Sequence, residues 1–429
     1  MKTVLMVAFH YPPCFGSSGI QRTLKLSRYL PDSGWRPIVL TAHPRAYAQT
    51  NTDQIADIPP SAHVTRAFAL DTSRHLAIRG SSLRLMSLPD RWVSWSLGAV
   101  PAGLRLIRRH RPAVLWSTYP IATAHLIGFA LHRITGLPWI ADFRDSMTEP
   151  GYPRDRLARL AYGAIERRVV AHAARLVFTA PSTRAMYLAR YPRLTADRCL
   201  VISNGYDESD FADLVPGRSG PARSRRVRLI HAGVIYPEER DPVPFFRALA
   251  GLKRDGVIGS ESLRVELRAS GSEDRYQGLL AELGIADVVK LLPALPYRQV
   301  LQECSEADGL LLLQGPSCNH QIPAKLYEYL RLRRPILALT DLAGDTAGVL
   351  SETGGATIVD LLDEQAIRRL LPGFLEEVRT GAHPLPNEVA ATRHARHVQA
   401  QSLADCFGAL AMPRQPSRHA DFLSVDRPE

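Results

Sequence analysis

The chain has 429 residues, of which 45% are hydrophobic and 22% are charged, and its mean hydropathy is −0.10. These values exclude a fibrous repeat and a fully disordered chain, and the length predicts two or three domains. The net charge is +11, and residues 1–215 carry a net +12 from 27 Lys and Arg against 15 Asp and Glu. Five cysteines without a Cys-x-x-Cys pair support neither a disulfide framework nor a zinc knuckle, so we expect a reducing, cytoplasmic setting.

Short apolar strands alternate with helices along the first half of the chain. The first apolar run, residues 3–9, meets His-Tyr-Pro-Pro rather than small residues, which favours a buried strand over a secretory signal. Residues 112–132 contain no Asp, Glu, Lys or Arg, but their Pro, His and Thr residues favour a strand, a turn and a buried helix over a membrane span. Further strands of this half are predicted at 37–40, 113–116, 139–141 and 176–179.

The second half repeats the pattern after a polar segment rich in Pro and Gly. Its predicted strands are 227–233, 263–269, 288–292, 309–313, 336–339 and 356–359. The fold class is therefore α/β, with two doubly wound, Rossmann-like domains that face each other across a cleft. The predicted boundaries are 1–210 for the first domain, 211–226 for a linker, 227–388 for the second domain, 389–412 for a helix returning to the first domain, and 413–429 for a disordered tail.

Two motifs of the first half lie where parallel strands end, which is the edge at which such sheets bind ligands. Gly16 and Gly19 follow the first strand, and backbone N–H groups at a helix start can bind an anion there; a plain strand–helix turn is the alternative. Asp142, Arg144 and Asp145 end a later strand, where a carboxylate can accept a proton or bind a hydroxyl; an internal salt bridge is the alternative. Asp145 and Arg144 rank above Asp142, whose alternate position points it toward the interior.

A third motif, in the second half, follows the buried strand at 309–313. Pro323 suits the first position of a helix, and the N–H groups that follow can hold a phosphate. Lys325 and Glu328 are three residues apart and share a helix face, so Lys325 can meet phosphate while Glu328 accepts from ribose hydroxyls. A surface Lys–Glu pair on an ordinary helix is the alternative.

In this order, the motifs resemble those of glycosyltransferase family 4, whose members have the GT-B fold. The resemblance covers nearly the whole chain. The segments that carry it are Tyr11-Pro12-Pro13 with Gly16 and Gly19, residues 138–145, 202–207 and 231–233, and residues 323–330 followed by 334–338.

The resemblance implies a retaining glycosyltransferase of the hexosyltransferase type that uses neither a metal nor a cofactor. The donor would be a UDP- or GDP-sugar, and the acceptor a polysaccharide or a lipid-linked glycan. In that case Glu328 binds the ribose, while Arg240 and Lys325 stabilise charge on the leaving diphosphate. The nucleotide-sugar site implied in this way is Gly16, Gly19, Gly233, Arg240, Ser270, Gly271, Pro296, Tyr297, Pro323, Lys325, Leu326 and Glu328.

The chain departs from the family at one catalytic position. Many members carry a glutamate eight residues before the ribose-binding one, and here that position is His320, which joins Asp145, Arg144 and Asp142 as a catalytic candidate. Two other functions remain open: a catalytically silent GT-B protein that binds nucleotide sugars, which His320 favours, and a nucleotide-sugar epimerase of the same fold. No nucleic-acid-binding signature is present.

A membrane contact is also expected from the first half. Residues 81–111 combine Trp92, Trp95 and Leu97 with several arginines, a mixture typical of the headgroup boundary. We therefore predict peripheral, salt-sensitive binding to anionic lipid, which places the protein at the inner face of the cytoplasmic membrane. The alternative is that these residues form the core and the Arg-rich faces of two ordinary helices.

Overall fold

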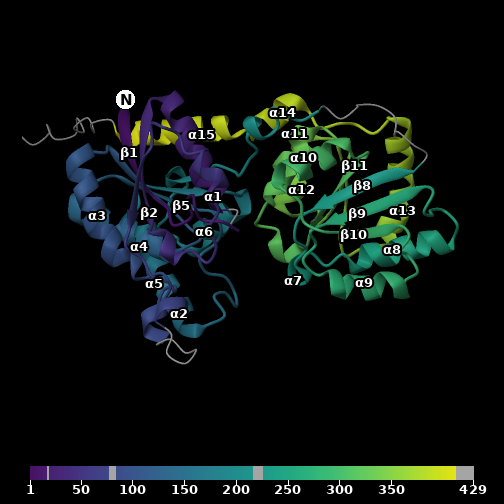
Figure 1. Cartoon of the computed structure of the whole chain (residues 1–429), viewed down its shortest axis with the longest axis horizontal. Helices are drawn as coiled ribbons and strands as arrows, with labels where there is room; N and C mark the ends of the chain where they lie inside the picture. The colour runs from purple at the N-terminus through teal and green to yellow at the C-terminus, as the bar shows by residue number, and fades with distance from the viewer. Residues whose placement is uncertain (17–18, 77–83, 216–225, 412–429) are drawn as a thin grey trace, which may run out of the picture.

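The structure is a computed structural model that describes residues 1–16, 19–76, 84–215 and 226–411. It has two lobes that lie side by side, and each lobe is a parallel sheet covered by helices (Figure 1). The predicted fold class is confirmed. Most of the predicted linker, 211–226, and the whole predicted tail, 413–429, lie outside the described residues.

The N-terminal lobe contains a seven-stranded sheet of order β3-β2-β1-β4-β5-β6-β7, in which every neighbouring pair is parallel. Its central strands are buried on both faces, which explains their continuous apolar runs. The strands are β1 (Lys2–Val7), β2 (Trp35–Ala42), β3 (His63–Ala67), β4 (Val114–Thr118), β5 (Trp139–Phe143), β6 (Arg175–Phe178) and β7 (Cys199–Val201). The helices are α1 (Gly19–Tyr29), α2 (Thr72–His75), α3 (Trp95–His110), α4 (Ala122–Thr135), α5 (Arg156–His172) and α6 (Pro181–Arg190).

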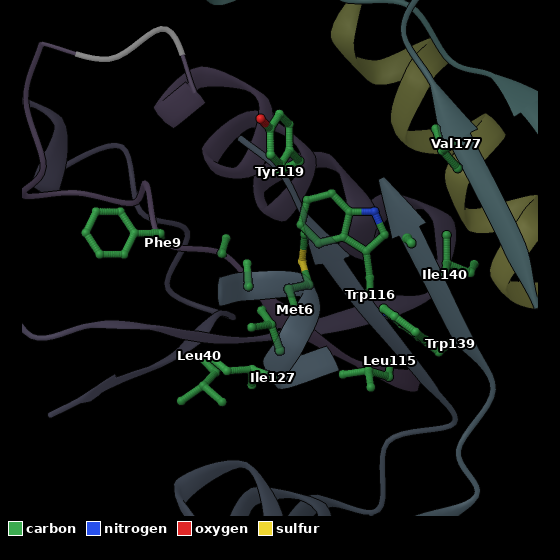
Figure 2. Packing of buried hydrophobic residues seen from close by; sticks show 14 of the residues in the cluster. Met6, Phe9, Leu40, Leu115, Trp116, Tyr119, Ile127, Trp139, Ile140 and Val177 are labelled. Carbon is green, nitrogen blue, oxygen red and sulfur yellow. The ribbon is translucent and has the colours of Figure 1, made fainter. Parts of the chain in front are cut away.

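Large side chains from adjacent strands fill the core of this lobe. Trp116 of β4 is the register partner of Met6 on β1 and of Ile140 on β5, and all three are buried (Figure 2). Ile127 of α4 belongs to the same buried cluster. Trp95, which the sequence places in a membrane-facing segment, is also fully buried here, so it is a core residue.

The C-terminal lobe contains a six-stranded parallel sheet of order β10-β9-β8-β11-β12-β13. Its strands are β8 (Val227–Ala232), β9 (Leu263–Arg268), β10 (Val289–Leu292), β11 (Gly309–Gln314), β12 (Ile336–Thr340) and β13 (Ala356–Val359). Its helices are α7 (Pro237–Arg240), α8 (Val243–Arg254), α9 (Glu273–Glu282), α10 (Tyr297–Glu306), α11 (Ala324–Leu332), α12 (Asp345–Thr353) and α13 (Glu364–Thr380).

The chain crosses between the lobes twice at one place. Tyr206, on the way out, forms a parallel bridge with Ala395 on the way back, and the N–H of Arg396 donates to the Tyr206 carbonyl at 2.8 Å. Gly205 is required at this crossing, because a Cβ there would lie 1.9 Å from the carbonyl oxygen of His394. After the short α14 (Glu388–Thr392), helix α15 (Arg396–Leu410) returns to the N-terminal lobe (Figure 1).

Most strands occur where the sequence predicts them, and β3 and β7 are additional. The apolar stretch 112–132 forms β4 and most of α4. None of the helices in the described ranges is long and apolar enough to cross a bilayer.

A buried ion pair joins three elements of the N-terminal lobe. The Arg22 guanidinium, on α1, donates to Asp142 at the end of β5 from Nη2 (2.7 Å) and from Nε (2.9 Å). It also donates to the carbonyl oxygens of Ile202 and Ser203, each at 3.0 Å, just after β7. The side chains of Arg22 and Asp142 are 2% and 0% exposed. The pair therefore fixes α1, β5 and the start of the crossing relative to one another.

Replacing Arg22 should destabilise the protein strongly. Arg22→Leu leaves the buried Asp142 carboxylate without its cation, so we expect the free energy of unfolding in urea to fall by about 3–5 kcal/mol. The matched control is Arg154→Leu, which removes a pair with Glu238 whose side chains are 87% and 82% exposed. The control should unfold almost as the unmodified protein does, and an equal loss in both variants would contradict this role for Arg22.

Candidate active site in the cleft between the lobes

A cleft of about 470 Å³ lies between the two lobes and is lined by residues of both. Several of these residues follow the carboxyl ends of strands, where doubly wound sheets bind ligands. The charged residues that the N-terminal lobe contributes are Lys25, Arg144, Asp145, Asp207 and Asp210. The C-terminal lobe contributes Arg240 and Glu328, and the returning helix contributes Arg396.

Glu328 and Tyr297 form one part of the C-terminal wall. The Tyr297 hydroxyl donates to Glu328 Oε1 at 2.7 Å, and burial raises the pKa of the Glu328 carboxyl. Glu328 lies on α11, and Pro323, which caps the N-terminus of this helix, also lines the cleft. The helix start, the carboxylate and the aromatic ring therefore lie in one place, as the sequence motif predicts.

Lys325 lies behind this wall and bonds to a histidine. The His231 ring donates from Nδ1 to the Leu311 carbonyl at 2.9 Å, which leaves Nε2 to accept from Lys325 Nζ at 3.0 Å. Burial, with the nearby charge of Arg240, lowers the pKa of Lys325 to about 7. Gly233 has φ +107, and a Cβ at this position would lie 3.2 Å from Nζ. The absence of a side chain at Gly233 thus leaves Lys325 room to reach the cleft.

Arg240 is held on the cleft wall by its own helix. Its guanidinium donates to Glu239 at 2.8 Å and lies 5.5 Å from the centre of the Tyr236 ring. Its charge acts on Lys325, so the two cations that the sequence assigns to a diphosphate are neighbours.

The three charged residues at the end of β5 differ in whether they line the cleft. Asp142 points into the protein, where Arg22 and the Thr118 hydroxyl (2.7 Å) occupy its carboxylate. Arg144 and Asp145 line the cleft. Burial lowers the pKa of Arg144, and the adjacent Asp145 carboxylate opposes this shift. The structure thus separates an inward Asp142 from an outward Arg144 and Asp145.

The first glycine loop reaches the cleft through Gly16. This residue has φ +79, a region that favours glycine, and it lines the cleft. Gly19 is buried at the first position of α1. The two residues between these glycines lie outside the described ranges.

His320 is not among the residues that line the cleft. Its Nε2 lies 2.9 Å from Glu149 Oε1, and this contact raises the pKa of the imidazole. Beside it, the Thr183 hydroxyl donates to the His320 carbonyl at 2.6 Å, and Ser182 donates to the Asp345 carboxylate. Because Glu149, Ser182 and Thr183 belong to the other lobe, these contacts join the two lobes.

Seven residues of the implied nucleotide-sugar site lie outside the set that lines the cleft: Gly19, Gly233 and Lys325, described above, and Ser270, Gly271, Pro296 and Leu326. The Ser270 hydroxyl and the Gly271 N–H both donate to Glu273, each at 3.0 Å. Pro296 caps helix α10 next to Tyr297, and the Leu326 side chain is fully buried in the core. The structure therefore gives these last four residues contacts outside the cleft.

Two cations on the wall are absent from the sequence motifs. Lys25 on α1 pairs with Asp207 at 2.8 Å and with Asp210 at 3.1 Å. Burial opposes ionisation of Asp207, but hydrogen bonds from Lys25 and Tyr29 lower its pKa to about 2. Arg396 comes from the first turn of α15, and only the return of the chain brings it to the cleft.

Comparison with known proteins agrees with this architecture. Residues 18–205 match the family model of the glycosyl transferase 4-like domain. A search of curated protein sequences gives no significant match.

Three solved structures illustrate the likeness in fold. The sucrose-phosphate synthase of Thermosynechococcus elongatus superimposes with a TM-score of 0.63 at 14% identity, over 96% of this chain and 99% of that one. The Anabaena protein HepE in complex with UDP and glucose gives a TM-score of 0.62 at 13% identity, over 95% and 100%. WaaG, a glycosyltransferase involved in lipopolysaccharide biosynthesis, gives 0.55 at 12% identity, over 94% and 95%.

The two facing parallel sheets define a protein of the GT-B fold. Residues 18–205, most of its N-terminal lobe, match the glycosyl transferase 4-like domain, and the whole chain shares the fold of these solved structures.

The buried Lys325 gives a test of the site's electrostatics. Its pKa in the folded protein, about 7, is below its ordinary value of 10.5, so below pH 7 the folded protein must hold a buried cation. Between pH 7 and 10 the folded protein has released that proton while the unfolded chain retains it, so this cost fades as pH rises.

Lys325→Met should therefore raise the melting temperature most at pH 6 and least at pH 9.5. Differential scanning calorimetry across this range measures the effect. Lys290→Met, on the surface of β10 where the lysine bonds only to the Ala286 carbonyl among the described residues, is the control and should show no such trend. A pH-independent difference for Lys325→Met would show that this lysine is not electrostatically strained.

Proposed function

We propose that the protein is a retaining glycosyltransferase that transfers a sugar from a UDP- or GDP-sugar to a glycan or lipid-linked acceptor, without a metal ion. The observation that carries the proposal is the cleft itself. It places the Arg240 cation and the Glu328 carboxylate on one wall, and Arg144 and Asp145 on the facing wall.

The C-terminal wall fits a nucleoside diphosphate. Glu328 accepts one hydrogen bond from Tyr297, and its carboxylate can accept others from the two ribose hydroxyls. Arg240 meets the diphosphate from the wall, and Lys325 exchanges its neutral histidine partner for a phosphate oxygen. Two cations placed where negative charge develops on the leaving group supply the stabilisation that a metal ion provides in other enzymes.

The N-terminal wall fits the acceptor. Asp145 can accept a hydrogen bond from the hydroxyl that attacks the sugar and can take its proton as the new bond forms. Arg144 lies beside it on the same wall. Retention of configuration is proposed from the family resemblance, and the anomeric configuration of the product, read by NMR, tests it.

A second candidate is a protein that binds nucleotide sugars without turning them over. His320 favours it, because this residue stands where many members have a glutamate that touches the donor sugar, and here its ring is bonded to Glu149. The protein would then bind a nucleotide sugar but release no nucleoside diphosphate. An epimerase would instead convert the nucleotide sugar to its isomer.

Purified protein incubated with a panel of UDP- and GDP-sugars tests the proposal. We expect release of nucleoside diphosphate with at least one donor, at a rate that EDTA does not change. Binding without release would support the silent protein, and isomerisation without release would support the epimerase. No binding of any nucleotide sugar would reject all three functions.

Substitutions on the two walls should separate donor binding from transfer. Glu328→Gln should weaken nucleotide binding by about 1–3 kcal/mol, the cost of an imperfectly satisfied polar contact.

Arg240→Ala should weaken binding of the nucleoside diphosphate more than of the nucleoside. Asp145→Asn should lower the transfer rate while the donor affinity, measured by calorimetry, stays within twofold. Equal effects of Arg240→Ala on nucleoside and diphosphate would contradict its assignment to phosphate.

We further propose that the protein works at the inner face of the cytoplasmic membrane. The support is an exposed apolar pair on the N-terminal lobe: Phe68 is 45% and Leu97 is 74% exposed. A Cβ on Gly98 would lie 2.8 Å from the Phe68 Cβ, so the Phe68 backbone lies directly against α3 beside Leu97. The Arg45 guanidinium lies 5.6 Å from the centre of the Phe68 ring. Apolar side chains with adjacent arginine suit the boundary of anionic lipid.

Vesicle flotation tests the membrane contact. The protein should float with anionic vesicles at low salt and lose binding at high salt. Phe68→Ser combined with Leu97→Ser should lower the bound fraction at least tenfold, because the apolar anchor is lost. Leu160→Ser, at a leucine of α5 that is 60% exposed, is the control and should bind normally. No flotation of the unmodified protein at low salt would favour a soluble acceptor.

A further inference from the structure

Arg396 is a buried cation that lines the cleft. It occupies the first helical position of α15, and only 5% of its surface is exposed. Its Nη1 donates to the Gln399 side chain at 3.2 Å. Within the described ranges no carboxylate lies within ion-pair distance of Arg396, although the cleft holds several acidic groups that are paired with other residues.

The surroundings of Arg396 disfavour its positive charge. Burial, and the adjacent charges of Arg22 and Arg144, lower the pKa of Arg396 to about 10. Arg22 is paired with Asp142, whereas the side chain that bonds to Arg396 within the described ranges is the neutral amide of Gln399. Arg396 also stands at the N-terminal end of a helix of 15 residues, where the helix dipole disfavours a cation. A charge held in this way is compensated only when an anion occupies the cleft.

Arg396 interacts with charged groups of both walls. The cations that act on it are Arg22 and Arg144 of the N-terminal lobe, and Arg396 itself acts on the Glu328 carboxyl of the C-terminal wall, whereas the charge that acts on Lys325 is that of Arg240. Arg144 belongs to the N-terminal wall, next to Asp145. Arg240 and Lys325 are therefore one pair of neighbouring cations, and Arg144 and Arg396, which both line the cleft, are a second pair.

We propose that Arg144 and Arg396 form an anion subsite that binds a phosphate or carboxylate group of the acceptor. The inference rests on the proposed function, in which the N-terminal wall receives the acceptor. Two guanidinium groups offer planar donors that suit the paired oxygens of either anion. The acceptor class is thus a negatively charged one: a phosphate ester, a diphosphate-linked glycan or an acidic sugar.

Inorganic phosphate and glucuronate are the two probes for this subsite. Each is titrated, by calorimetry and by thermal shift, into the protein saturated with whichever of UDP or GDP it binds. We expect at least one probe to bind and stabilise the nucleotide-bound protein. Arg396→Gln should weaken that binding at least tenfold and leave the affinity for nucleotide within twofold. Loss of phosphate binding alone indicates a phosphorylated acceptor, and loss of glucuronate binding alone indicates an acidic sugar.

The melting temperature of the ligand-free variant separates binding from a structural role. Removal of an uncompensated cation should leave the melting temperature of Arg396→Gln equal to or above that of the unmodified protein, whereas a structural arginine would lower it. If Arg396→Gln does not fold, the inference is overturned on this ground. Arg396→Lys, which keeps the charge but loses the planar fork, should retain weak binding of the probe.

Three further outcomes would overturn the inference. In the first, neither probe binds the nucleotide-saturated protein. In the second, the probe binds Arg396→Gln as tightly as it binds the unmodified protein. Alternatively, Arg396→Gln loses nucleotide affinity as severely as Arg240→Gln does, which would assign Arg396 to the donor diphosphate. Failure of the proposed function looks different: no nucleotide binds, while titration of phosphate into Arg240→Gln still reports on Arg396.

Discussion

The bidentate bond between Arg22 and Asp142 is the constraint on which the N-terminal wall of the cleft depends. It uses a carboxylate at the end of β5 to hold α1 and the chain leaving β7. Asp142 lies near the end of β5 and points toward the interior, and Arg144 and Asp145, which follow the end of this strand, line the cleft. Arg144 and Asp145 are thereby presented to a ligand from a backbone that is itself anchored by a buried ion pair. The glycine loop before α1 is held by the same contact, since Arg22 is on that helix.

The cleft concentrates charge at a cost to the ligand-free protein. Lys325, which is half-buried, faces a neutral histidine, and Arg396, which is buried, faces a neutral glutamine. Acidic residues are close by, but Asp142, Asp207 and Asp210 are engaged by Arg22 and Lys25. The site thus keeps cations available that the protein could have neutralised internally. Such an arrangement is expected of a surface built to receive anions, because the ligand supplies the missing charge.

The sequence predicts the fold well because parallel strands that are buried on both faces must be apolar along their length. The strands it misses lie at the two edges of the first sheet: β3 contains His63 and Arg66, and β7 has only three residues. Polar residues interrupt β3, and the apolar run at β7 is short. For the site, the motifs single out Glu328, Arg144 and Asp145 and the family resemblance singles out Arg240, and the structure has all four lining the cleft.

Other residues of the site were beyond sequence reasoning. Arg396 is far from every motif and reaches the cleft only because the chain crosses back beside Tyr206. Trp95 shows the converse: a tryptophan among arginines suggests a lipid contact, yet packing against the sheet makes it a core residue. Composition along the chain does not show which face of a helix is covered. His320 likewise matches a motif position, but its partner Glu149 comes from the other lobe.

The returning helix α15 also ties the order of folding to the order of synthesis. Its Leu403 and Phe407 belong to the core of the N-terminal lobe, and the Phe407 ring packs edge-on to Trp35 with centres 5.2 Å apart. A ribosome therefore releases the last apolar layer of the first lobe only after it has made the whole second lobe. The C-terminal sheet is continuous in sequence from β8 to β13 and needs no such later segment. During translation, part of the apolar surface of the N-terminal lobe therefore stays exposed until α15 has been made. The C-terminal lobe can complete its core before that.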